Sequence, residues 1–148
     1  MLNNEVNDKV FGIMTYKHRW IKKEKINFWN HSYEITIAAK AYSNKPITDE
    51  QRKSYEYFKK NISTLSEETA KKLCNYINID IEELDIKGIN KKRVEAIEDL
   101  NNIVFPKTIL FKQDGESIIL CDYIFDEDNG LGIKVYPSLE IGSQDLFL

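Results

Sequence analysis

The first third of the chain shows an alternation of apolar and polar positions. Val10 to Tyr16 is apolar and rich in residues that favour strands, and it leads through Trp20 into the polar stretch Lys22–Lys25, which we interpret as a turn or an exposed edge. Further on, every second residue is apolar and would share one face of a strand: Tyr33, Ile35, Ile37, Ala39 and Ala41. This pattern predicts a half-buried antiparallel strand.

The period becomes helical after Pro46. Thr48 and Gln51 have the spacing of a capping box, which predicts a helix over about 49–61. A second helix is expected to begin behind Ser66, with two glutamates in its first turn. Its buried face would carry Ala70, Leu73, Ile77 and Ile81. We expect these two helices to pack together, and a third, short helix near 91–101 before Pro106 marks the return to strand.

Two glycine turns mark the last third of the chain. Asp114-Gly115 and Asn129-Gly130 accept the positive φ angles of tight hairpins. They separate three strand-like segments, Thr108–Lys112, Ser117–Asp126 and Leu131–Tyr136. The middle segment is apolar on both faces, as expected of a central strand, and Leu139–Gly142 with Leu146–Leu148 would add a last edge.

The combined pattern predicts an α+β fold. Its sheet would be mainly antiparallel and built from N-terminal and C-terminal strands, with two or three central helices packed on one face. At 148 residues without a linker or repeat, the chain is expected to form a single domain over 1–148.

Composition and charge bear on the location of the protein and on the kind of partner it could bind. We see neither an apolar run long enough to span a bilayer nor a secretory signal at Met1–Glu5, so the sequence predicts no membrane association and a cytoplasmic protein. The net charge of −3 is uneven, because residues 1–65 carry 12 Lys/Arg against 7 Asp/Glu while residues 66–148 carry 9 against 17. An acidic second half suggests a basic partner.

Candidate chemistry is sparse. His18 and His31 lack the spacing of a metal pair, and Cys74 and Cys121 are interpreted as small core residues rather than as zinc ligands or a disulfide. Six glycines form neither a dinucleotide turn nor a phosphate loop, so no cofactor is expected. The carboxylates of Asp126–Gly130 partly match a calcium loop but lack its later glutamate, which favours a solvated hairpin turn.

A basic run near the N-terminus could in principle bind nucleic acid. Its cations Lys17, Arg19, Lys22, Lys23 and Lys25 interleave with the rings of Trp20, Phe28 and Trp29. The overall acidity favours another interpretation, an edge strand protected by lysines with its tryptophans in the core.

Several short motifs together resemble a known group of proteins. Phe11-Gly12 with Tyr16 and Trp20, the helix carrying Gln51, the closing run Phe125–Gly132 and Ile141-Gly142 are similar to small bacterial domains of unknown function that look like immunity proteins of polymorphic toxin systems. The closing motif of that group runs Trp-Asp-x-Glu-His-Gly-Leu-Gly. Here Phe125, Asp128 and Asn129 stand in the Trp, Glu and His positions, so the glycine turn is kept and the proton-transferring histidine is lost.

The resemblance implies a protein that binds rather than catalyses. We expect an immunity protein that neutralises a cognate toxin by covering its active or substrate surface. Six acidic residues could complement a basic nuclease toxin: Glu82, Glu83, Asp85, Asp126, Glu127 and Asp128. The alternatives are a metal-assisted hydrolase that uses the carboxylates of Asp122–Asp128 and, ranked last, a nucleic-acid module built on Lys17 to Trp29.

Overall fold

A computed structural model describes residues 4–43 and 45–148. The strands are, in chain order, β1 (Glu5–Asp8), β2 (Gly12–Tyr16), β3 (Trp20–Phe28), β4 (His31–Ala39), β5 (Val104–Phe111), β6 (Ser117–Tyr123), β7 (Leu131–Tyr136) and β8 (Glu140–Gly142). The helices are α1 (Asp49–Lys60), α2 (Ile62–Ile86) and the 3-10 turns η1 (Ile97–Asn102) and η2 (Gln144–Leu146). The predicted α+β class is therefore confirmed.

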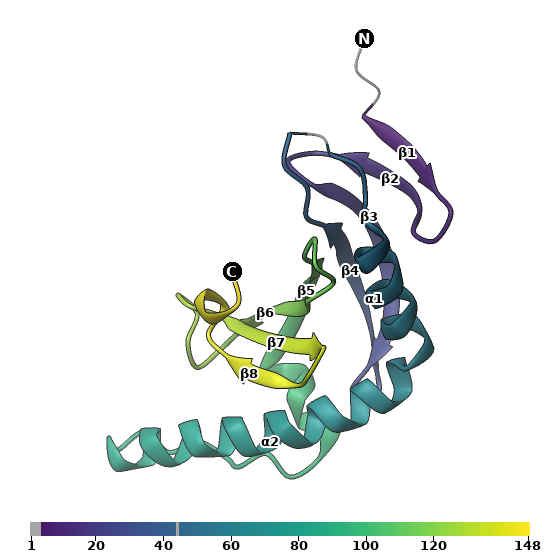
Figure 1. Ribbon diagram of the computed structural model, residues 1–148. Coiled ribbons are helices and arrows are strands. Elements are labelled where there is room, and N and C mark those ends of the chain that lie inside the picture. Colours follow the sequence, from purple (N-terminus) through teal and green to yellow (C-terminus); the bar gives the residue numbers. More distant parts are fainter. Residues whose placement is uncertain (1–3, 44) are drawn as a thin grey trace.

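The eight strands form one sheet whose order follows the chain, β1 to β8. Neighbouring strands are antiparallel, with the exception of β4 and β5, which run parallel. Helices α1 and α2 lie between these two strands in the chain, and Figure 1 shows them beside the curved sheet. Contacts of α1 with β5, and of α2 with β3 and β8, join both halves of the sheet to the helical layer.

Strand β3 is longer than the sequence pattern indicates. The polar stretch Lys22–Lys25 is no turn but lies within β3, where it pairs with Ile37 to Glu34 of β4. Within the described residues, β3 pairs with β2 only through Trp20 and Ile21, so the segment beyond Ile21 is a sheet edge, as the second part of our interpretation states.

Helix α1 begins as the capping box predicts. The Thr48 hydroxyl accepts a hydrogen bond from the Gln51 amide N–H, while the Gln51 side-chain oxygen accepts one from the Thr48 N–H. The Gln51 amide group also donates to the carbonyls of Lys40 and Phe111, although Gln51 is fully buried. One polar residue thus caps the helix and ties it to the ends of β4 and β5.

The predicted start of the second helix is wrong. Helix α2 begins four residues before Ser66, directly after Asn61, which is also the last cap of α1, so the two helices meet end to end. The Ser66 hydroxyl instead accepts a hydrogen bond from the Trp29 N–H. The expected buried face of α2 is confirmed, because its four predicted residues are at most 2% exposed.

The predicted helix near 91–101 is also wrong. Residues 89–95 have no regular structure, and only η1 forms. The buried Asn78 side chain of α2 pairs with the backbone N–H and C=O of Val94, which holds this segment extended along α2. In the last third, both glycine turns and the β8 edge are confirmed. The expected strand at Leu146–Leu148 does not form, because Leu146 ends η2 and the two residues after it are not in a strand.

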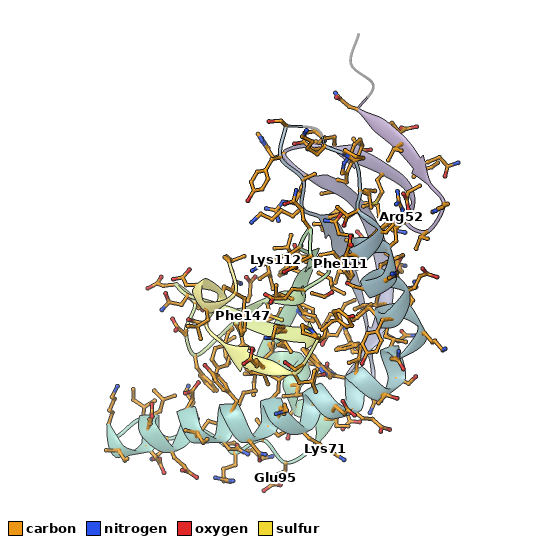
Figure 2. The ribbon with its side chains drawn as sticks, viewed as in Figure 1. Arg52, Lys71, Glu95, Phe111, Lys112 and Phe147 are labelled. Atoms are coloured by element: carbon orange, nitrogen blue, oxygen red, sulfur yellow. The ribbon has the colours of Figure 1, made fainter. Side chains whose placement is uncertain are left out.

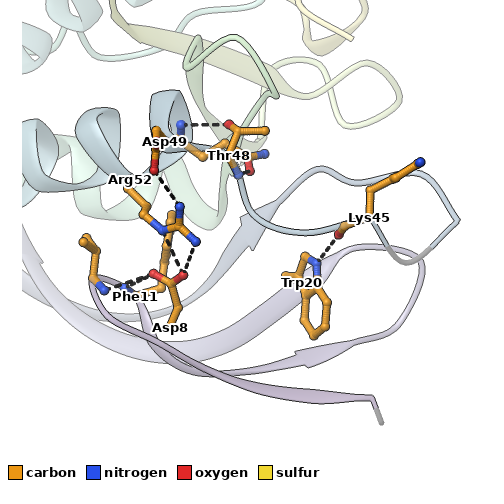
Figure 3. A network of polar contacts seen from close by, with 9 residues as sticks. Asp8, Phe11, Trp20, Lys45, Thr48, Asp49 and Arg52 are labelled. Atoms are coloured by element: carbon orange, nitrogen blue, oxygen red, sulfur yellow. Dashed lines mark hydrogen bonds and ion pairs between the residues drawn. The ribbon is translucent and has the colours of Figure 1, made fainter. Parts of the chain in front are cut away.

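One hydrophobic core spans the sheet and both helices. Figure 2 shows its side chains between the layers, with Phe111 of β5 beneath α1 and Phe147 after η2. A polar network at its edge ties the β1–β2 hairpin to α1 (Figure 3). The Asp8 carboxylate accepts hydrogen bonds from the N–H groups of Val10 and Phe11 and from Arg52, which also binds Asp49.

This network predicts a loss of stability in acid. Burial alone would raise the pKa of Asp8, but hydrogen bonds from Arg52, Phe11 and Val10 outweigh burial and hold it below its ordinary value of 3.8. A carboxyl with a lowered folded pKa stabilises the protein above its unfolded pKa and loses that contribution as the pH falls through the folded pKa. Urea unfolding of the wild type should therefore need less denaturant at about pH 3 than at about pH 5.

Two variants test the assignment to Asp8. Asp8→Asn should show a smaller loss between these two pH values, because the titrating group is gone. Asp145→Asn, at an exposed aspartate, should retain the full wild-type loss. Equal losses in all three proteins would contradict the role given to Asp8.

Candidate functional site

The C-terminal half of α2 presents a polar stripe beside its buried face. Tyr76, Asp80, Glu83 and Lys87 follow one another at spacings of four, three and four residues, so they share one side of the helix and its end. The neighbouring buried residues Ile77 and Ile81 fix this side relative to the core. The stripe therefore lies beside the β6–β7 connection, with Tyr76 and Asp80 half-buried and Glu83 and Lys87 exposed.

Two aromatic rings come from the end of β6. Tyr123 is its last residue and is 2% exposed, while Phe125 is half-buried. The rings of Tyr123 and Phe125 meet edge to face with centroids 5.6 Å apart, and the Tyr76 ring lies 6.4 Å from that of Tyr123. Strand alternation would have placed Tyr123 inside, but its contact with α2 depends on the tertiary fold.

A short hydrogen bond joins the helix to the strand. The Tyr123 hydroxyl donates to the Asp80 carboxylate over 2.5 Å. Burial and this carboxylate both raise the pKa of Tyr123, so the phenol keeps its proton and remains a donor. Burial also raises the pKa of Tyr76, together with the negative charges of Asp80, Asp126 and Glu83.

The turn after β6 supplies the third side. The Asp126 carboxylate accepts hydrogen bonds from the N–H and the side-chain amide of Asn129. Gly130, with φ of +62°, then packs against the Cys121 carbonyl and the Gln144 amide. Asn129, at the histidine position of the closing motif, thus shapes the turn through Asp126.

These elements enclose a hollow of about 200 Å³. We call it the tyrosine hollow; it is lined by Tyr76, Asp80, Glu83, Leu84, Lys87, Tyr123, Phe125, Asp126 and Gly130. Three carboxylates and one ammonium give its lining a formal charge of −2. Rings on the walls and carboxylates on the rim can bind a cationic group.

The structure brings some of the six predicted partner-binding residues together. Glu83 and Asp126, from distant segments, line the tyrosine hollow. Glu82 points elsewhere and pairs with Arg93 over 3.0 Å, and Glu127 lines a separate hollow with Asp122. The remaining two, Asp85 and Asp128, are exposed near these segments.

Seven of the nine residues that line the hollow lie outside the predicted partner-binding set, among them Tyr76, Asp80, Tyr123 and Phe125. The helical spacing of Tyr76, Asp80 and Glu83, next to the buried residues of α2, could have predicted that these three side chains lie on one side of the helix. The contribution of the β6 residues had no local signal, because it arises from a contact 43 residues apart in sequence.

Two structural findings bear on the alternative functions, the metal-assisted hydrolase and the nucleic-acid module. Among residues 4–43 and 45–148, no group of three or more His, Cys, Asp or Glu is arranged to hold a metal ion. The rings proposed to stack nucleic-acid bases are core residues, since Trp20 is 6% exposed and Phe28 and Trp29 are fully buried. This agrees with the interpretation of that run as an edge strand whose tryptophans face the core.

We assign no function to the two cysteines or to a second, wider hollow beside α2. Cys121 is fully buried, as expected of a core residue, and Cys74 is half-buried; both are free thiols. A hollow of about 730 Å³ lies between α2 and the following segment, and its lining includes Lys71 and Glu95 (Figure 2).

Within the described part of the chain, no helix combines the length and apolarity that crossing a membrane requires. The expectation of no signal at Met1–Glu5 concerns in part residues 1–3, which lie outside the described residues. The cytoplasmic location stays a prediction.

Comparison with known proteins finds one family. Residues 10–148 match the model of a family described as Domain of unknown function (DUF6985). No curated protein and no solved structure matches the chain. The match confirms the expected membership in a family of domains of unknown function, and the likeness to immunity proteins stays a prediction.

Proposed function

Because the chain belongs to the DUF6985 family, a family of domains of unknown function, we propose its function from geometry and sequence: an immunity protein that binds a cognate bacterial toxin and covers its active or substrate surface. The observation that carries the proposal is an exposed surface at the C-terminal end of α2 that combines acidic and apolar side chains. We call it the acidic surface and define it by Glu82, Glu83 and Asp85 of α2 together with Asp126, Glu127 and Asp128 after β6; Asp126 is half-buried and the other five are exposed.

Large apolar side chains accompany these charges. Ile79 is 57% exposed, Ile86 86% and Ile124 44%. Ile86 is the last residue of α2, whose end projects past the sheet in Figure 1. Exposed apolar groups within a charged rim are typical of protein-binding surfaces.

The charges favour a basic partner. With the exception of the Glu82–Arg93 and Asp126–Asn129 contacts, the six acidic groups form no hydrogen bond or ion pair with the described residues. Their fields therefore reach solvent, where they can steer a basic protein and speed its association by roughly 10- to 1,000-fold. A nuclease toxin, whose substrate surface must attract phosphates, carries the matching positive charge.

Co-expression tests the proposal. The wild-type chain should protect cells from the toxin encoded beside its gene, whereas the triple variant Glu82→Lys, Glu83→Lys, Asp85→Lys should lose protection and associate with the toxin at least about 10-fold more slowly. Survival counts and association rates at two salt concentrations provide the measurements.

A matched control separates local from global charge. The variant Glu56→Lys, Glu67→Lys, Glu68→Lys has the same net charge but alters exposed positions on α1 and the first half of α2. It should protect as the wild type does. Continued killing in the presence of folded, abundant wild-type protein would contradict the proposed function.

A further inference from the structure

The rings of the tyrosine hollow are held in place before any ligand arrives. Tyr123 is buried and fixed by its 2.5 Å hydrogen bond to Asp80. Tyr76 and Phe125 flank it, both half-buried and both in ring contact with it. The rings, rather than the carboxylates alone, make the hollow a site, because aromatic faces attract a cation and confine it.

The charges in the hollow are not balanced internally. Asp80, Glu83 and Asp126 face one cation, Lys87. Lys87 forms no ion pair with any described residue, and the same is true of Glu83. A second cation would therefore meet a net negative lining without having to break an existing ion pair.

The size of the hollow selects the kind of ligand. Its volume of about 200 Å³ is below the ~300–1,000 Å³ of sites for small molecules and cofactors, and it suits one long side chain. A guanidinium is planar, stacks on aromatic faces and donates two parallel hydrogen bonds to a carboxylate. The half-buried rings of Tyr76 and Phe125 and the carboxylates on adjacent walls offer both contacts.

We propose that the tyrosine hollow receives an arginine side chain of a partner protein, with the guanidinium against the half-buried rings of Tyr76 and Phe125 and hydrogen-bonded to Glu83 and Asp126. The identity of that partner as a toxin rests on the function proposed above. The capacity of the hollow to bind arginine does not, and it can be measured on the isolated protein.

The probe is acetyl-arginine-methylamide, and its neutral isostere acetyl-citrulline-methylamide is the control. Titration at constant ionic strength should shift the ring resonances of Tyr76, Tyr123 and Phe125 in NMR spectra with saturation in the millimolar range. The citrulline compound should bind at least 5-fold more weakly, because it lacks the charge. Equal shifts with both compounds, or shifts at other residues, would overturn the proposal.

Three variants sharpen the test. Glu83→Gln should weaken arginine binding at least 3-fold. Asp85→Asn removes the same charge two residues away, on another side of α2 and outside the lining, and should change binding less than 1.5-fold. Lys87→Met should strengthen binding, because it removes the competing cation. Equal weakening by Glu83→Gln and Asp85→Asn would show attraction to the general field and would overturn a specific hollow.

The two proposals can fail separately. Neutralisation of the toxin by a protein that shows no arginine-specific shifts would remove the hollow from the interface and leave the immunity function standing. Arginine-specific shifts in a protein that fails to protect against the toxin would do the reverse.

Discussion

Replacement of Trp29 with alanine should lower the free energy of unfolding by about 3–5 kcal/mol. Trp29 lies in the turn between β3 and β4 and is fully buried. Its indole N–H donates to the Thr69 hydroxyl and its backbone N–H to that of Ser66, so one residue ties the hairpin to α2. Alanine would remove the ring and one bond and leave a cavity where three elements meet.

Urea unfolding followed by circular dichroism measures this loss. Tyr42→Ala is the control, because Tyr42 is an aromatic residue with 61% exposure, and its loss should stay within about 0.5 kcal/mol. If the alanine variant of Trp29 does not fold, Trp29→Phe retains most of the ring volume and should fold with a smaller deficit. A stable Trp29→Ala protein that matches Tyr42→Ala would refute the anchoring role.

The variant Gly130→Ala should cost about 2–5 kcal/mol. Gly130 has φ of +62°, which alanine adopts only with strain, and an added Cβ would lie 2.9 Å from the Cys121 carbonyl oxygen and 2.6 Å from the Gln144 side-chain nitrogen. Gln144 can move only by giving up its own hydrogen bond to that carbonyl. The closing glycine motif is therefore a packing requirement of the C-terminal turn.

Gly88→Ala measures the backbone part of this effect without the steric part. Gly88 follows α2 with φ of +83°, and a Cβ there would meet no described atom within 4 Å. Its cost should be that of the backbone conformation alone, about 1–2 kcal/mol. Denaturation midpoints of the two variants give the comparison, and equal losses would show that close packing at Gly130 is unimportant.

Local signals predicted the parts of the fold that depend on local physics. The Thr48–Gln51 capping box and the Asp114-Gly115 and Asn129-Gly130 turns satisfy their backbone groups within a few residues, so their sequence is sufficient. Ser66 gave a wrong start for the second helix, because its hydroxyl accepts a hydrogen bond from the N–H of Trp29, 37 residues away. The parallel pairing of β4 with β5 was not predicted, since alternation fixes the face of a strand but not its neighbour.

The candidate site divides in the same way. Two of the three acidic residues that line the hollow, Glu83 and Asp126, were predicted from charge, whereas Asp80 was not. The aromatic residues of the hollow were not predicted. Tyr123 has the pattern of an ordinary buried strand residue, and only the tertiary fold shows that its hydroxyl donates to Asp80. The sequence thus predicted two of the carboxylates of the site, and only the tertiary fold revealed its aromatic residues.

The parallel pairing of β4 with β5 carries the largest loss of chain entropy in the formation of the sheet. Its register places Thr36 opposite Thr108, a separation of 72 residues (108 − 36), whereas the antiparallel pairs join strands that are connected by seven residues or fewer. Closure of a loop of that length costs roughly 4 kcal/mol by the logarithmic rule. Ile37, Ile109 and Phe111, which lie in these two strands and are fully buried, supply the hydrophobic free energy that offsets it.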